Sequence, residues 1–117
     1  ALSVHARITA VNTPPMSEGV SYGMHYRSPG SVKICAVPIG YADGYARALS
    51  SRTSIIYDGH LCRQVGNICM DQCMFEVDLR SHGTHRRLDP HVGDEVGTIP
   101  HELCCALSLR MPKVYLR

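Results

Sequence analysis

The chain has 117 residues, 44% of them hydrophobic, and this length and composition suit a single soluble domain with its own core. Its formal charge is +2, with twelve basic and ten acidic residues and no basic stripe, so we expect no nucleic-acid partner. No apolar run approaches the ~20 residues that a membrane helix needs, and we expect no membrane span. The chain starts at Ala1 without a signal-peptide pattern, and we expect it to be a piece of a longer protein.

Four stretches have the alternating or β-branched composition that is typical of strands. They are residues 2–11, 32–39, 53–65 and 73–78. The first stretch alternates apolar with polar residues and predicts a half-buried strand. The third contains Asp58-Gly59, which favours a tight type I′ turn and therefore predicts a hairpin. Residues 41–47 predict a turn or a short helical piece between strands.

The last third of the chain is less regular. Residues 79–91 are polar and predict an exposed loop, whereas residues 93–96 resemble the entry to a strand. Residues 100–107 predict a helix of two or three turns with Thr98 as its cap. Residues 111–116 predict an edge strand, where a proline is tolerated. The predicted fold is therefore mainly β with one short helix.

The six cysteines form no C-x-x-C pair, and several of them lie in apolar runs, as Cys35 does. We therefore expect buried, reduced thiols rather than disulfides. A zinc site would have to recruit Cys69, Cys73, His82 and His85. Their spacing matches no common zinc finger, so we predict no metal site.

Three turns rich in small residues each present a polar or aromatic group: residues 19–23 (the first turn), 38–45 (the second turn) and 65–72 (the third turn). In the first turn Tyr22 lies between glycines, where the backbone is free to aim the ring. The alternative for Tyr22 is a ring packed at the end of a strand with a hydrated hydroxyl. Because all three turns lie on β segments, we expect them to share one surface.

Five short strings resemble, in order and with compatible spacing, the C-terminal domain of bacterial alanine racemase. They are Gly19-Val20-Ser21-Tyr22-Gly23 and residues 39–44, 66–72, 92–96 and 112–115. The resemblance implies that residues 1–117 form the small barrel-like or sandwich-like β domain of a fold-type III enzyme that depends on pyridoxal 5′-phosphate. The lysine that attaches the cofactor belongs, by the same resemblance, to an N-terminal α/β barrel domain that this chain lacks.

The activity that the resemblance implies is the interconversion of L-alanine and D-alanine. In this family, two bases on opposite faces move the α-proton of alanine, which is held as an aldimine on the cofactor. The barrel lysine is one base, and Tyr22 is implied to be the other, acting in the partner subunit's site. A phenol has an ordinary pKa near ~10, so groups on the barrel and the cofactor would have to supply a shift worth about 3 to 4 kcal/mol.

The resemblance also implies partners and a location. The partners are the N-terminal barrel domain, the second subunit of a homodimer and alanine as substrate, in a cytoplasmic enzyme that supplies D-alanine for peptidoglycan. The isolated domain is expected to be inactive. Two alternatives stay open, namely a racemase of broader amino-acid specificity and a non-catalytic dimerisation or binding module.

Four further residues are implied to bind the substrate. Tyr41 and Arg47 match residues of the active-site entryway. The backbone N–H of Met70 is implied to meet the substrate carboxylate, and Asp71 to lie close to the catalytic tyrosine. Residue type alone leaves Met70 equally compatible with core packing. Asp43 is expected to order its own turn, because an Asp in such a position commonly accepts hydrogen bonds from neighbouring amides.

Two departures from the family pattern are visible. His101 stands where the family commonly has a tyrosine that contacts the cofactor phosphate. An imidazole can donate to phosphate, so His101 is assigned to cofactor binding, with a surface histidine as the alternative. Val96 is followed directly by Gly97, where the family usually continues with a strand end and a helix. This junction predicts either a deletion or missing residues.

Overall fold

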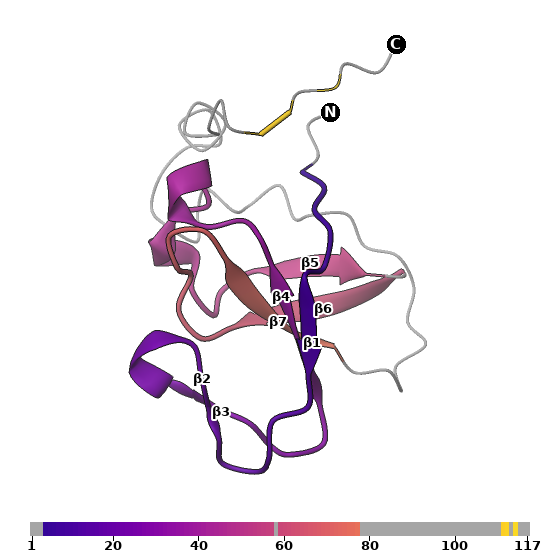
Figure 1. Cartoon of the computed structure of the whole chain (residues 1–117), viewed down its shortest axis with the longest axis vertical. Coiled ribbons are helices and arrows are strands. Elements are labelled where there is room, and N and C mark those ends of the chain that lie inside the picture. The colour runs from indigo at the N-terminus through magenta and orange to yellow at the C-terminus, as the bar shows by residue number, and fades with distance from the viewer. Residues whose placement is uncertain (1–3, 58, 78–110, 113, 115–117) are drawn as a thin grey trace.

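The computed structural model describes residues 4–57, 59–77, 111, 112 and 114. Within them, five strands form an antiparallel sheet in the order β1-β4-β7-β6-β5, and two more form a small ribbon, β2-β3 (Figure 1). The strands are β1 Ala10–Asn12, β2 Gly19–Val20, β3 Tyr26–Arg27, β4 Lys33–Val37, β5 Ser54–Tyr57, β6 His60–Val65 and β7 Cys73–Val77. Short 3-10 helices lie in the connections: η1 Tyr22–Met24, η2 Tyr41–Asp43 and η3 Arg47–Leu49. The predicted mainly β fold is confirmed.

The centre of the sheet is the pairing of β4 with β7, which runs from Lys33↔Val77 to Val37↔Cys73. Both strands were expected from the density of β-branched and apolar residues. β4 is slightly shorter than the predicted 32–39, and β7 includes every described residue of the predicted 73–78. The predicted hairpin is also confirmed, since β5 pairs with β6 and Gly59 in its turn has a φ of 76°. Glycine tolerates this left-handed backbone without steric cost, which is why the turn can be tight.

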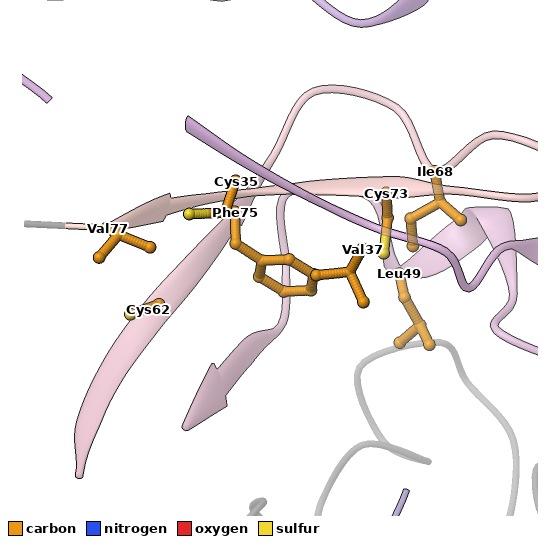
Figure 2. Close-up of a cluster of buried hydrophobic side chains, with 8 residues drawn as sticks. All are labelled: Cys35, Val37, Leu49, Cys62, Ile68, Cys73, Phe75 and Val77. Carbon is orange, nitrogen blue, oxygen red and sulfur yellow. The ribbon is translucent and has the colours of Figure 1, made fainter. Parts of the chain in front are cut away.

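The core lies against β4 and β7. Alternate residues of β7 point inward, so that Cys73, Phe75 and Val77 are buried while the two residues between them are partly exposed. Figure 2 shows the cluster gathered along β7; its members are Cys35, Val37, Leu49, Cys62, Ile68, Cys73, Phe75 and Val77. Leu49 is the last residue of η3, and Ile68 lies in the third turn. Both pack into the core, which therefore also anchors the segments that follow the second turn and precede β7.

The prediction of buried, reduced thiols is confirmed for four cysteines. Cys35, Cys62, Cys69 and Cys73 are free and buried, and the other two cysteines lie outside the described residues. Burial raises the pKa of the Cys73 thiol to about 12, and it also raises the pKa values of Cys35 and Cys62. These thiols therefore behave as small apolar side chains of the core.

The predicted half-buried strand at residues 2–11 is wrong in its length and its burial. Among the described residues of this stretch, which begin at Val4, the strand starts only at Ala10, and all three residues of Ala10–Asn12 are exposed at the edge of the sheet. The register with β4 ends where Ala10 lies opposite Ala36. The Thr9 N–H also donates to Ala36 O, at 2.9 Å, so the regular pairing is already interrupted at Thr9.

The end of the chain also departs from expectation. Met111, Pro112 and Val114, which are the described part of the predicted edge strand, lie outside any strand, and Pro112 has no N–H to contribute to one. The predicted loop at residues 79–91, the strand entry at 93–96 and the helix at 100–107 lie outside the described residues. No helix in the described part of the chain is long and apolar enough to cross a membrane.

Candidate functional site

The second and third turns are joined through their backbones. The Tyr41 N–H donates to Cys69 O at 3.0 Å, and the Ala42 N–H donates to Met70 O at 3.0 Å. Gly40 permits this approach, because a Cβ there would lie 2.2 Å from Cys69 O and 2.3 Å from Met70 O. Tyr41 is therefore fixed beside the third turn, and it remains 42% exposed.

The buried side chain of Asp43 stabilises the conformation of the second turn. Its carboxylate is buried, and Oδ2 accepts a hydrogen bond of 3.0 Å from the Gly40 N–H. Its own N–H donates to Gly40 O at 3.0 Å, and Gly44 then continues the chain with a φ of 95°. The prediction that Asp43 orders its own turn is confirmed, and the residue takes no exposed position at the surface.

The first and third turns are joined through side chains. Ser21 Oγ donates to Asn67 O at 2.7 Å, and Asn67 Nδ2 donates to Tyr22 O at 2.8 Å. The backbone of Tyr22 is therefore held, whereas the residue itself is 73% exposed. The alternative of a ring packed at the end of a strand does not describe Tyr22.

The three turns thus share one surface, as the sequence predicted. Met70 is 54% exposed on the third turn, so the alternative of core packing is wrong for this residue. Met70 O accepts from the second turn, whereas no backbone carbonyl of the described residues accepts the Met70 N–H. Asp71 follows directly and is exposed.

Arg47 is also tied to the third turn. It begins η3, and its carbonyl accepts hydrogen bonds from the Ser50 N–H at 3.0 Å and from Ser50 Oγ at 2.6 Å. The same Ser50 Oγ accepts a hydrogen bond of 2.9 Å from the Ile68 N–H. The structure therefore brings Arg47, with an exposed side chain, to the connection between the two turns. His101 lies outside the described residues.

Two polar residues that organise the site were missed by the sequence analysis. Gln64 is fully buried; its Nε2 donates to Val65 O and Gly66 O at 3.0 Å each, and its Oε1 accepts from the Ser51 N–H. Asn67 joins the first and third turns. A glutamine within an otherwise alternating strand was a signal for Gln64, whereas Asn67 has no local signature, because its contact is 45 residues away.

The described tyrosines differ in what their hydroxyl groups can do. Burial and the hydrogen bond to Glu76 raise the pKa of Tyr26 to about 12. Burial also raises the pKa of Tyr45 to about 12, and its hydroxyl is hydrogen-bonded to Thr53 Oγ1. Both phenols are held in the protonated state and are unsuited to act as bases near neutral pH. Tyr22 and Tyr41 are the exposed tyrosines on the three turns.

The described residues do not by themselves form a site for pyridoxal phosphate. Lys33, the lysine among them, is exposed on β4, and the described helices are single turns without a Gly-rich phosphate cradle at their start. They also contain no cluster of three or more His, Cys, Asp or Glu side chains that could hold a metal ion. For the zinc alternative, Cys69 and Cys73 are buried thiols, whereas His82 and His85 lie outside the described residues.

The fold and the site define a class: a small β domain that presents exposed side chains on three linked turns. A family model described as "Alanine racemase, C-terminal domain" matches residues 1–115. The chain belongs to the alanine racemase C-terminal domain family.

Relatives and solved structures agree with this assignment. An alanine racemase of Desulforamulus reducens is 36% identical over 99% of this chain, and one of Lactiplantibacillus plantarum is 39% identical over 99%. Among solved structures, an alanine racemase from Bacillus anthracis with bound L-Ala-P superposes with a TM-score of 0.84 at 25% identity over 96% of this chain and 32% of that one. Another, from Bartonella henselae with covalently bound pyridoxal phosphate, has a TM-score of 0.80 at 26% identity over 93% and 33%.

The chain spans about a third of the length of these relatives, 34% of each of the two named. An alignment with an alanine racemase of Clostridium perfringens runs over 135 residues, which is longer than the chain itself. That relative therefore has residues within the matched stretch that this chain lacks.

Proposed function

We propose that this chain is the C-terminal domain of an enzyme that interconverts L-alanine and D-alanine, and that Tyr22 is one of its two acid–base groups. The observation that carries the proposal is the exposed phenol of Tyr22 on a backbone tied to the turn that bears Met70. Membership of the family supplies the reaction class. In this reaction Tyr22 Oη takes the proton from the α-carbon of one enantiomer, or returns a proton to the same face.

The other assigned residues orient the substrate. The Met70 N–H, which no described backbone carbonyl accepts, donates a hydrogen bond to the substrate carboxylate. Asp71 follows Met70 and acts close to Tyr22. Tyr41 and Arg47, both exposed on segments tied to the third turn, line the entrance to the site. This arrangement holds the α-carbon near a base and leaves the side chain of alanine to the other wall of the site.

Pyridoxal phosphate is proposed as the cofactor, with its lysine on an N-terminal barrel domain and His101 toward its phosphate. When bound, it stabilises the negative charge that develops on the α-carbon of the substrate. The described residues of this chain do not hold it. Because Tyr22 and Met70 face outward from their own domain, the site is completed by another part of the protein. We propose the barrel of a second subunit in a homodimer, in a cytoplasmic enzyme that provides D-alanine for peptidoglycan.

The test is Tyr22→Phe in the full-length enzyme, which removes the hydroxyl and keeps the ring. We expect racemisation of alanine to fall by about 100-fold or more, the typical contribution of a positioned acid or base. Tyr57→Phe is the matched control, because Tyr57 is an exposed tyrosine on the β5–β6 hairpin, and it should leave the rate unchanged. An equally small change in both variants would contradict the role of Tyr22 and favour a non-catalytic binding module.

The substrate range has its own test. Rates of the full-length enzyme on alanine, serine and lysine compare the proposed activity with a racemase of broader specificity. A preference for alanine supports the proposal. Similar values of kcat/KM on all three would show instead a broad amino-acid racemase built on the same domain.

A further inference from the structure

The residue that precedes Tyr22 has a strained backbone. Ser21 has a φ of 66° and a ψ of 173°, a region that is otherwise almost confined to glycine. Glycines stand nearby in the first turn, yet a serine occupies the strained position. A non-glycine residue stays in such a conformation only where the surrounding structure holds it there, and sites of this kind concentrate where function needs a fixed geometry.

A reciprocal contact holds Ser21 in place. Ser21 Oγ donates to Asn67 O at 2.7 Å, and the side chain of Asn67 donates from Nδ2 to Tyr22 O at 2.8 Å. We call these two residues the Ser21–Asn67 pair. Gly66 makes room for it, since a Cβ at Gly66 would lie 2.6 Å from the Cβ of Ser21. The two hydrogen bonds hold the chain on both sides of the peptide bond between Ser21 and Tyr22, one at the Ser21 side chain and one at the Tyr22 carbonyl.

The proposed function requires a fixed separation between two groups on different turns. A base must lie about 2.6–3.2 Å from the proton that it removes, and a displacement of about 1 Å costs much of the rate. Asn67 lies three residues before Met70 on the third turn, whereas Ser21 is the direct neighbour of Tyr22. The Ser21–Asn67 pair thus links the two turns by hydrogen bonds, and Ser21 Oγ also lies 3.6 Å from Sγ of Cys69, the residue that precedes Met70.

We infer that Ser21 and Asn67 are positioning residues, which fix the position of the Tyr22 phenol relative to the substrate held at Met70. This inference rests on the proposed function. A purely structural role is the competing explanation. Ser21→Gly separates the two, because glycine accepts the backbone conformation of Ser21 but cannot make the hydrogen bond to Asn67. A positioning role predicts a retained melting temperature with a lower kcat, whereas a structural role predicts that activity follows stability.

The experiment measures exchange of the α-proton in D2O for each enantiomer of alanine separately, with the full-length holoenzyme. Tyr22→Phe identifies the enantiomer that Tyr22 serves, because only that exchange is lost. We expect Ser21→Gly and Asn67→Ala to lower the same exchange tenfold or more and to leave the other within twofold. In the Tyr22→Phe background, Ser21→Gly should change neither exchange by more than twofold, since residues that act as a unit are non-additive.

Ser17→Gly is the matched control. Ser17 is also a serine with a positive φ, 67°, and it lies before the first turn, so the substitution places glycine at another positive-φ serine without altering the Ser21–Asn67 pair. It should alter neither exchange. Normal exchange in both Ser21→Gly and Asn67→Ala, or an equal loss for both enantiomers that parallels the melting temperature, would overturn the inference alone. If Tyr22→Phe leaves both exchanges intact, the proposed function fails first and the inference with it.

Discussion

The hydroxyl of Tyr26 donates a hydrogen bond of 2.7 Å to Glu76 Oε2 and so joins the β2–β3 ribbon to β7 of the main sheet. Arg63 of β6 completes the group, with Nη2 3.4 Å from the same carboxylate oxygen and the guanidinium 6.0 Å from the centroid of the Tyr26 ring. Because the first turn connects β2 to β3, this contact fixes the ribbon that carries Tyr22.

Tyr26→Phe should lower the free energy of unfolding by about 1 to 2 kcal/mol, because it removes a hydrogen bond to a charged group that water can partly replace at Glu76. Urea denaturation of the full-length protein measures the change. The exposed Tyr57 provides the control, and Tyr57→Phe should stay within about 0.5 kcal/mol of the wild type. A Tyr26→Phe value as small as the control would show that the ribbon does not depend on this bond.

Stability should fall at alkaline pH in part because of Tyr45. Burial raises the pKa of Tyr45 to about 12, whereas an unfolded tyrosine ionises near ~10. Between these values the unfolded state releases a proton that the folded state keeps. The contribution of Tyr45 is therefore complete below pH ~10 and is lost as pH rises to ~12, and it amounts to about 2 to 3 kcal/mol.

Tyr45→Phe tests this dependence, because phenylalanine packs in the same place and does not titrate. Urea unfolding of the full-length protein at several pH values from ~9 to ~11 should show a shallower decline for the variant. Some decline remains, since Cys73 and Tyr26 also have pKa values raised to about 12. Parallel curves for the two proteins would contradict the assignment to Tyr45.

Gly40→Ala should separate the second turn from the third. The added methyl group would lie 2.2 Å and 2.3 Å from two carbonyl oxygens of the third turn, neither of which is the flexible end of a side chain. We expect a loss of stability of about 3 kcal/mol or more, together with a loss of racemisation by the full-length enzyme. Circular dichroism melting and initial rates are the measurements.

Gly59→Ala is the comparison for Gly40→Ala. Gly59 lies in the β5–β6 hairpin turn with a φ of 76°, so alanine there suffers from the left-handed backbone. It should cost about 1 kcal/mol and leave racemisation intact. Equal losses of activity in the two variants would show that the contact of Gly40 with the third turn is not specific to the site.

Gln64→Leu should be severely destabilising although leucine is apolar. The side chain of Gln64 is fully buried and makes hydrogen bonds to Val65 O, Gly66 O and the Ser51 N–H. Leucine leaves buried backbone groups without these partners, and we expect a loss of about 2 to 4 kcal/mol in urea denaturation. Gln72→Leu, at an exposed glutamine, should change stability by no more than about 0.5 kcal/mol.

Local chemistry made part of this protein predictable. The β5–β6 hairpin follows from a glycine that tolerates positive φ, and β4 and β7 follow from short runs of β-branched and apolar residues. Asp43 was predicted correctly because its hydrogen bond to Gly40 spans three residues. The strand expected at residues 2–11 was wrong, because alternation along the chain does not show where the register with β4 ends, which is at Ala10 opposite Ala36.

The sequence by itself determined the mainly β fold, the family and the three turns, since each depends on neighbouring residues or on the order of short strings. Only the tertiary structure decided how the turns meet. It assigned the link to Asn67 and Ser21, placed the strain on a serine rather than a glycine, and distinguished the exposed Tyr22 from Tyr26. Contacts between residues that are 45 or 50 positions apart arise from the pairing of strands, which no local pattern encodes.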